Sequence, residues 1–314
     1  MNTEWYIKRL SWKMRMFMHT HFGWKVAKTT YNGRRILTLE ETNRHLKELL
    51  LTKEPFAVAR IGGSECKAMV ACQPEYHDEK QKAFLHNLLV NLSGFFGSME
   101  DFDRFSRLME SGLSEVDLMG VWFNQMEDYF LKRFGKADMT YGLLEGLEPW
   151  YSPDDPWTAS LAGKRVVVIH PFAESIEKQY AKRELLFPGT EILPAFSLRT
   201  VKAVQTLLGQ PDPRFATWFD ALEYMYNEAM KEDFDVALIA CGAYGLPLAV
   251  KLKQAGKQAI QIGGSLQLLF GIKGARWKDM PQMQRFYSDA WTSPSLKTEG
   301  LDSGVENVEN GCYW

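Results

Sequence analysis

The chain has 314 residues, of which 46% are hydrophobic and 24% are charged, a balance typical of a folded globular protein rather than a disordered one. Its formal net charge of −2 argues against nucleic-acid binding, because such proteins carry an excess of basic residues. The four cysteines lack zinc-ligand spacing, and no apolar run is long enough to cross a membrane, so we expect a cytoplasmic protein without a structural metal site.

Positive charge is concentrated in an N-terminal arm, residues 1–35, which holds eight Lys and Arg residues against Glu4. The arm is formally +7, which leaves −9 for the rest of the chain. If residues 5–22 are helical, one face gathers apolar side chains and basic residues lie opposite. That face could lie on an anionic membrane surface, or it could pack on the domain or on a second subunit. The apolar face consists of Tyr6, Ile7, Leu10, Met14, Phe17 and Met18.

Beyond the arm, short apolar runs alternate with segments of helical periodicity. In chain order we predict helix 39–51, strand 56–61, helices 81–92 and 101–109, strand 117–122, helix 124–134, an apolar segment 139–143, strand 165–170, helix 174–186, strand 191–195, helices 198–208 and 216–231, strand 235–241, helix 246–255 and strand 258–262. This order predicts a Rossmann-like α/β domain at 36–292, with a mostly parallel sheet and helices on both faces. Residues 293–314 form a C-terminal tail without predicted structure.

The first candidate site follows strand 56–61, where Gly62 and Gly63 let the chain turn sharply before Ser64 and Glu65. Open α/β sheets bind their ligands at the carboxyl ends of strands, so Arg60 and Glu65 are placed for chemistry. The structural alternative is that Glu65 opens a helix and Arg60 pairs with a buried carboxylate.

Three more turns could bind a ligand. His170 ends a β-branched strand and could act as a base or bind phosphate, and Glu174 could bond a sugar hydroxyl. The three turns also have structural alternatives: His170 could be only a hydrogen-bond partner, the second turn could serve packing, and the third could be a solvated basic loop. The second turn, with amides for a diphosphate and a ring for stacking, contains Gly242, Tyr244 and Gly245. The third offers glycines, positive charge and an indole ring, and contains Gly263, Gly264, Ser265, Lys273, Arg276 and Trp277.

The stretch from Arg60 to Glu65 resembles the R-F-G-D-G-E motif of GT-D type glycosyltransferases, bacterial enzymes that extend glycans from nucleotide sugars. Arg60, Gly62 and Glu65 match the motif, whereas Gly63 stands where the family has Asp and Ser64 where it has Gly. The run from D-V-A-L-I-A-C-G-A-Y-G to Q-A-I-Q-I-G-G is similar to the closing strand, helix and strand of those enzymes. The strings I-H-P-F-A-E-S-I, F-G-I-K-G-A-R-W and G-C-Y-W resemble proteins associated with bacterial surface polysaccharides.

The resemblance implies transfer of a sugar from a nucleotide diphosphate to a glycan or lipid-linked acceptor, in surface polysaccharide biosynthesis. It also implies a divalent cation, Mn²⁺ or Mg²⁺, with Glu65 as a ligand, although Gly63 removes the second carboxylate. A different reading is a non-catalytic protein that binds a nucleotide sugar or glycan within a polysaccharide assembly complex. Carboxylates that could activate the acceptor hydroxyl are Asp101, Asp103, Asp155 and Glu174.

Overall fold

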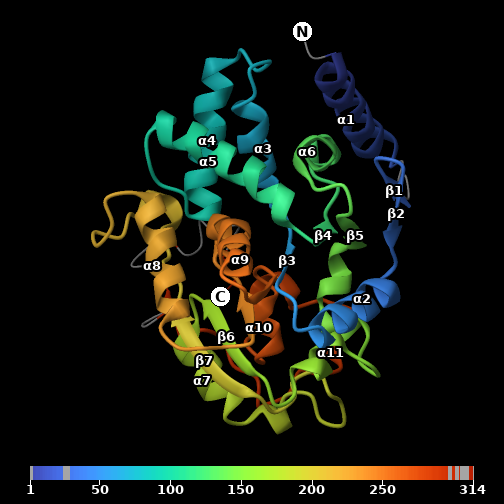
Figure 1. The fold of residues 1–314 in the computed structure, drawn as a ribbon, viewed down its shortest axis with the longest axis vertical. Coiled ribbons are helices and arrows are strands. Elements are labelled where there is room, and N and C mark those ends of the chain that lie inside the picture. Colours follow the sequence, from blue (N-terminus) through green and yellow to red (C-terminus); the bar gives the residue numbers. More distant parts are fainter. Residues whose placement is uncertain (1–2, 24–28, 296–298, 301–303, 305–310, 314) are drawn as a thin grey trace.

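The computed structural model describes residues 3–23, 29–295, 299–300, 304 and 311–313. Within these residues the strands form one nine-stranded sheet in the order β1-β2-β5-β4-β3-β9-β8-β6-β7 (Figure 1). Neighbouring strands run parallel except β1 and β2, which pair antiparallel at one edge. The strands are β1 (Thr30–Tyr31), β2 (Arg34–Leu37), β3 (Phe56–Ala59), β4 (Leu118–Val121), β5 (Thr140–Leu143), β6 (Arg165–His170), β7 (Ser197–Lys202), β8 (Val236–Ile239) and β9 (Gln258–Gln261).

Helices cover both faces of this sheet, so the predicted α/β architecture is confirmed. One face carries α3 (Gly63–Ala71), α4 (Glu79–Ser93), α5 (Met99–Gly112), α6 (Glu127–Phe134), α8 (Trp218–Met230) and α9 (Gly245–Gln254). The other carries α2 (Leu39–Leu51), α7 (Ala173–Tyr180), α10 (Leu266–Leu269) and α11 (Pro281–Gln284).

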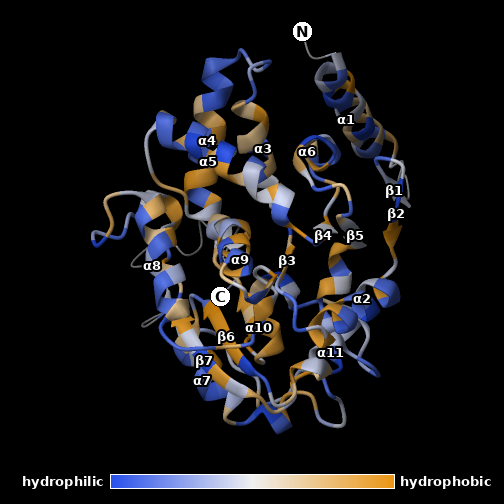
Figure 2. Cartoon of the chain, viewed as in Figure 1, coloured by the Kyte–Doolittle hydropathy of each residue, from blue (hydrophilic) through white to orange (hydrophobic). Residues whose placement is uncertain are grey.

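The central strands are buried on both faces, which explains their continuous apolar sequences. In β6, Val167 and Ile169 pack in the core under α8 and α9, whereas Val166 and Val168 pack on the opposite side. Side chains alternate in this way because successive residues of a strand point to opposite faces. Figure 2 shows hydrophobic residues along the sheet and hydrophilic ones spread over the outer helices.

Two of the predicted elements are wrong. Residues 197–202 form strand β7, not the start of a helix, and they pair with β6 along its whole length, from Arg165 opposite Ser197 to His170 opposite Lys202. The apolar spacing there suits a helix, but the free edge of β6 accepts a strand, and tertiary pairing overrides local periodicity. Residues 191–195 contain no strand, although Ile192 is buried. The predicted helix 174–186 ends as α7 at Tyr180 and continues in a short 3₁₀ turn.

Within the N-terminal arm, helix α1 (Thr3–Phe22) lies beside α6 (Figure 1), whereas β1 and the first half of β2 belong to the sheet, so the predicted boundary at residue 36 falls inside β2. Trp5 is fully buried in the core, and two ion pairs, Lys8 with Asp128 and Lys132 with Glu4, join the two helices. The apolar face predicted for the arm is turned the other way, to solvent. No helix among residues 3–23, 29–295 and the short described pieces of the tail is long and apolar enough to span a bilayer. Lys25 and Lys28 of the arm lie outside the described residues.

Candidate functional site

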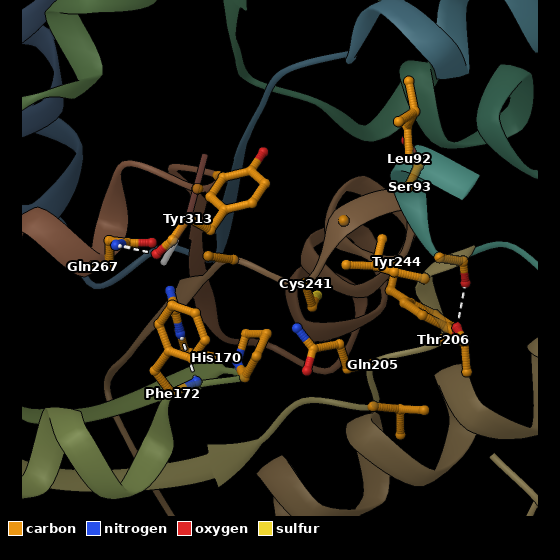
Figure 3. A pocket seen from close by; sticks show the side chains of 18 of the residues that line it. Leu92, Ser93, His170, Phe172, Gln205, Thr206, Cys241, Tyr244, Gln267 and Tyr313 are labelled. Carbon is orange, nitrogen blue, oxygen red and sulfur yellow. Dashed lines mark hydrogen bonds between the residues drawn. The ribbon is translucent and has the colours of Figure 1, made fainter. Parts of the chain in front are cut away.

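A pocket opens at the carboxyl ends of five neighbouring strands, β3, β9, β8, β6 and β7 (Figure 3). It contains about 710 Å³ of space not filled by protein atoms, including its opening to solvent. Ligands of open α/β sheets bind at this edge. We call it the strand-end pocket, and its wall consists of Arg60, Leu92, Ser93, Gly94, His170, Pro171, Phe172, Val204, Gln205, Thr206, Leu207, Ala240, Cys241, Gly242, Tyr244, Gln261, Gly263, Gly264, Gln267 and Tyr313.

Arg60 is the one lysine or arginine in the wall that the structure describes. Its backbone N–H donates to Gln261 Oε1 at 3.1 Å, and its guanidinium carbon lies 4.8 Å from the centre of the Trp122 ring. Its Nε is buried without a hydrogen-bond partner among the described residues, none of which forms an ion pair with the guanidinium. The Glu148 carboxyl group interacts with Arg60 electrostatically. Arg60 is only partly buried, and the remainder of its guanidinium can bind an anionic ligand that enters the pocket.

The loop that carries Trp122 is held by a buried carboxylate that sequence reasoning missed. Glu127, at the start of α6, is fully buried and accepts hydrogen bonds from the Trp122 N–H (3.2 Å), the Asn124 N–H (3.0 Å) and the Tyr31 hydroxyl (3.1 Å). Burial raises the pKa of Glu127 to about 7. The Asn124 side chain also donates to the backbone just after β3 at 2.9 Å. These bonds fix the indole ring on which Arg60 rests.

His170 ends β6 and lines the pocket as a neutral hydrogen-bond donor (Figure 3). Its Nδ1 accepts a hydrogen bond from the Phe172 N–H at 2.9 Å, so the ring proton resides on Nε2. Burial lowers the pKa of His170 to about 3, which keeps the ring uncharged. Of the two roles expected for this residue, the geometry suits phosphate or hydroxyl binding and does not suit a base.

The glycines of two predicted turns bring backbone close to the pocket. Gly242 has φ +59°, and a Cβ there would lie 2.5 Å from a backbone carbonyl of α4. Gly263 has φ +84°, and a Cβ there would lie 2.3 Å from Arg60 Nε. At Gly264 a Cβ would lie 2.2 Å from a ring carbon of Tyr313. Only glycine fits these three positions, because any side chain would displace the groups that form the wall.

Tyr244 contributes its hydroxyl rather than a stacking face. The ring is almost fully buried and lies parallel to Trp218, with a centroid separation of 4.4 Å and an interplanar angle of 8°. Its hydroxyl lies 3.1 Å from Thr206 Oγ1. A base or sugar therefore cannot use the face that Trp218 covers. The neighbouring Gly245 is not in the wall and packs against the Gln261 side chain.

The end of the tail forms one side of the pocket, which sequence reasoning did not foresee. Figure 3 shows Tyr313 and Gln267 on one side and Tyr244, Thr206 and Ser93 on the other. Arg276 holds the tail in two ways: its N–H donates to the Cys312 carbonyl at 3.0 Å, and its Nη1 donates to the Tyr313 hydroxyl at 3.3 Å. The Trp277 ring lies 5.9 Å from that of Tyr313. Arg276 and Trp277 thus support the wall from behind.

Two glutamines in apolar segments are further site residues that the sequence analysis did not name. Gln261 ends β9 and contacts Arg60, as described above. Gln267 is fully buried, and its Nε2 donates to the carbonyls of Lys273 (3.0 Å) and Tyr313 (3.0 Å), which leaves Oε1 without a donor among the described residues. A buried acceptor in a pocket wall suits a ligand hydroxyl or N–H. Glutamine within otherwise apolar runs was the signal that could have identified both residues.

Glu65 lies outside the wall. It belongs to the first turn of α3, is 8% exposed, accepts a hydrogen bond from the Ser64 hydroxyl at 3.0 Å, and packs over Gly62, where a Cβ would lie 2.1 Å from Oε2. Gly63 instead faces Asn124. No group of three or more His, Cys, Asp or Glu residues in the described part of the chain could hold a cation. These residues do not fit a protein-held Mn²⁺ or Mg²⁺.

The other predicted carboxylates also lie outside the wall. Asp155 is exposed and forms an ion pair with Lys47 of α2, and Glu174 is exposed and lies 4.0 Å from Lys178. Asp101 accepts the Ser98 N–H as part of the capping box of α5. Asp103 forms an ion pair with Lys82.

Two other predicted site residues also lie outside the wall. Ser265 is buried behind it. Lys273 lies beside a second hollow, against the Tyr287 ring.

The buried neutral state of His170 has a measurable consequence for stability. Its folded pKa of about 3 lies below the unfolded value near 6.5, so stability is lost as pH falls below about 6.5. Between pH 7.5 and pH 5 we expect His170 to contribute a loss of about 2 kcal/mol, from 1.36 kcal/mol per pH unit. Urea unfolding of the wild type and of His170→Asn at both pH values measures it. A similar loss in the variant, whose amide oxygen can still accept the Phe172 N–H, would contradict this assignment.

Comparison with family models and with curated proteins found no match. Among solved structures, a chain described as a highly conserved domain of unknown function 1792 with a distinct glycosyltransferase fold is similar at 14% identity and a TM-score of 0.39, over 88% of this chain and 93% of that one. A second, described as a new glycosyltransferase (DUF1792) from Streptococcus sanguinis, is similar at 15% identity and a TM-score of 0.37, over 82% and 96%. We take the function of the present chain from the chemistry of its own pocket.

Proposed function

We propose that this protein is a glycosyltransferase that moves a sugar from a nucleotide diphosphate donor to a glycan or lipid-linked acceptor in surface polysaccharide biosynthesis. The observation that carries the proposal is the guanidinium of Arg60 at the strand-end pocket, whose Nε has no hydrogen-bond partner among the described residues. Diphosphate is the anion that an arginine fork binds well, and the edge of the sheet is where nucleotides bind in such folds. The motif resemblance at Arg60, Gly62 and Glu65 supports the same class.

The pocket can stabilise the charge of a departing nucleoside diphosphate. The turn from Gly242 to Tyr244 leads directly into α9, a helix of 10 residues, so the positive end of the helix dipole lies beside the pocket. Arg60 supplies a full charge, and His170 Nε2 supplies a neutral donor. Donors fixed where negative charge develops lower the barrier for cleavage of the bond between sugar and phosphate.

Glu148 lies outside the wall, but its charge acts on Arg60, and we infer that it is the carboxyl group that activates the acceptor hydroxyl. It follows β5, at the same edge of the sheet as Arg60. Burial raises its pKa to about 7, while a hydrogen bond with Ser265 and the charge of Arg60 oppose the rise. A base works best with a pKa near the pH of the reaction. Asp155 and Glu174 have ordinary surface ion pairs instead, so we place them outside the reaction.

Release of nucleoside diphosphate tests the proposal. Purified protein is incubated with UDP-, GDP- and dTDP-sugars, with and without a mixture of glycan and lipid-linked acceptors, and the freed diphosphate is measured. We expect one donor to be turned over, and an Arg60→Gln variant to be inactive. Saturable binding of a nucleotide sugar without turnover would instead support the second candidate, a non-catalytic binding protein of an assembly complex, which the loss of Asp at position 63 favours.

We further propose that α1 holds the protein on an anionic membrane at its cytoplasmic face, where lipid-linked acceptors are found. Its outer face exposes Ile7 (62%), Leu10 (65%), Met14 (58%) and Phe17 (50%), although such side chains are normally covered. The arm is formally +7, so a second copy of it would be repelled and anionic lipid would attract it.

Replacing Leu10 and Phe17 together by serine is expected to weaken binding to vesicles of phosphatidylcholine and phosphatidylglycerol by at least about tenfold, since partial burial of each side chain contributes about 1 kcal/mol. Co-sedimentation measures this loss. The exposed positions are changed because deletion of the arm would also remove Trp5 from the core. A Thr20→Ser variant on the same helix is the control, and equal binding by all three proteins would refute a membrane role for α1.

A further inference from the structure

The described wall of the strand-end pocket contains no carboxylate. Its polar side chains are one arginine, one neutral histidine, three glutamines, and hydroxyl groups of serine, threonine and tyrosine. Divalent cations such as Mg²⁺ are held by oxygen ligands, in nucleotide sites usually one or two carboxylates together with phosphate oxygens. Within the described wall a cation would find amide, hydroxyl and backbone carbonyl oxygens, and the Glu148 carboxyl group lies outside that wall. The wall therefore suits a free anion better than an anion that carries a bound metal ion.

The nearest carboxylate in the motif is also committed elsewhere. Glu65 is largely buried, bonds the Ser64 hydroxyl and packs over the backbone of Gly62, and Ser64 is fixed in turn by a 2.6 Å contact with Ser93. The position beside it, where a second carboxylate would assist, is Gly63. A metal ligand must direct its lone pairs at the ion, whereas the Glu65 carboxylate contacts the Ser64 hydroxyl and the Gly62 backbone of its own turn.

We propose that the strand-end pocket binds the diphosphate of its nucleotide without a divalent cation, with the Arg60 guanidinium as counter-charge and neutral N–H groups as the remaining donors. This inference rests on the proposed function and specifies how the same site meets its substrate. Arg60 Nε has no hydrogen-bond partner in the described structure, so it can donate to the diphosphate. His170 Nε2 adds a donor without adding charge.

Arg60 forms no salt bridge among the described residues, and Glu148 acts on it only through its charge. Its guanidinium carbon lies 4.8 Å from the centre of the Trp122 ring, and the Gly263 backbone is so close that a Cβ there would lie 2.3 Å from Arg60 Nε. A pre-oriented fork binds a diphosphate with two parallel hydrogen bonds and loses little entropy on doing so.

Isothermal titration of the full-length protein tests the inference. UDP, GDP, dTDP and inorganic pyrophosphate are titrated at constant ionic strength in EDTA, in Mg²⁺ and in Mn²⁺. We expect the dissociation constant of the best ligand in EDTA to lie within about threefold of its value in the Mg²⁺ or Mn²⁺ buffer, because no protein group coordinates the cation. Electron paramagnetic resonance of Mn²⁺ gives a second readout, and we expect the protein to add no bound Mn²⁺ beyond that held by the nucleotide.

The outcomes separate the two proposals. Binding that falls more than about tenfold in EDTA, or additional Mn²⁺ bound by the complex, would overturn the metal-free site and leave the glycosyltransferase proposal standing. No binding of any probe in any buffer would overturn both. Arg60→Lys supplies the matched control: it keeps the charge and loses the fork, so we expect weakened binding that Mg²⁺ does not restore.

Discussion

Arg60→Gln is expected to lower the affinity for the nucleoside diphosphate by about 30- to 1,000-fold, since removing one partner of a buried charge pair costs about 2–4 kcal/mol. The loss should be seen with every base that binds, because the guanidinium contacts phosphate and not the base. Isothermal titration against wild type measures it. The backbone N–H of position 60 still reaches Gln261, so the local fold is kept.

The same substitution is expected to leave the unliganded protein as stable as before, or more stable. In the described structure Arg60 forms no salt bridge, and its buried Nε has no partner, so the free protein loses only the electrostatic interaction with Glu148 when the charge is removed. A structural arginine would behave in the opposite way. Thermal unfolding without ligand decides between the two, and a Tm that falls together with the affinity would contradict a ligand-binding role.

Gly263→Ala is expected to abolish nucleotide binding nearly as completely as loss of Arg60. A Cβ at this position would lie 2.3 Å from Arg60 Nε, and the guanidinium, as the end of a long side chain, would move to make room. The fork would then leave the pocket while the core stays intact. Because φ is +84°, alanine also adds backbone strain of about 1–2 kcal/mol to the folded state. Titration and urea unfolding of the variant measure the two effects separately.

Gly256→Ala is the matched control. Gly256 follows α9 with φ +81°, almost the same backbone conformation, and a Cβ there would meet no atom within 4 Å. We expect it to cost the same strain energy as Gly263→Ala and to bind nucleotide like the wild type. If both variants lost binding, strain alone would explain the result and the contact with Arg60 would have no special role.

The central strands could be predicted from the sequence because burial on both faces leaves a continuous apolar run. Residues 56–59, 166–169 and 236–239 are such runs, and all three lie in strands of the sheet. β7 could not be predicted in this way, since the spacing of Leu198 and Val201 fits a helix and only the open edge of β6 selects a strand. The two-residue β1 is too short for any periodicity.

The candidate site could be predicted where it depends on strand ends, and not where it depends on distant segments. Arg60, His170, Gly242 and Gly263 follow buried strands, and parallel strands bring their carboxyl ends to one edge. Tyr313 reaches the same pocket from the tail, at a sequence distance that no local pattern records. The tail contributes to the wall through Arg276, which fixes a segment that the sequence analysis left without structure.

The carboxylates show a further limit of sequence reasoning. Asp155 and Glu174 are residue types that suit catalysis, but a surface lysine lies beside each of them and neither reaches the wall. Glu127 and Glu148, with pKa values raised to about 7 by burial, are set apart only by their surroundings in the fold. Residue type alone cannot distinguish a solvated carboxylate from a buried one.

The central claim is that the strand-end pocket binds a nucleotide diphosphate through Arg60, and thermal unfolding against a ligand panel tests it most directly. The panel holds nucleosides, nucleoside monophosphates, nucleoside diphosphates and nucleotide sugars, because a ligand that binds only the native state raises Tm. We expect Tm to rise with one nucleoside diphosphate and with the nucleotide sugar that contains it, to change little with the nucleoside, and not to rise in Arg60→Gln. An equal rise in wild type and Arg60→Gln, or no rise with any phosphate ligand, would contradict the account.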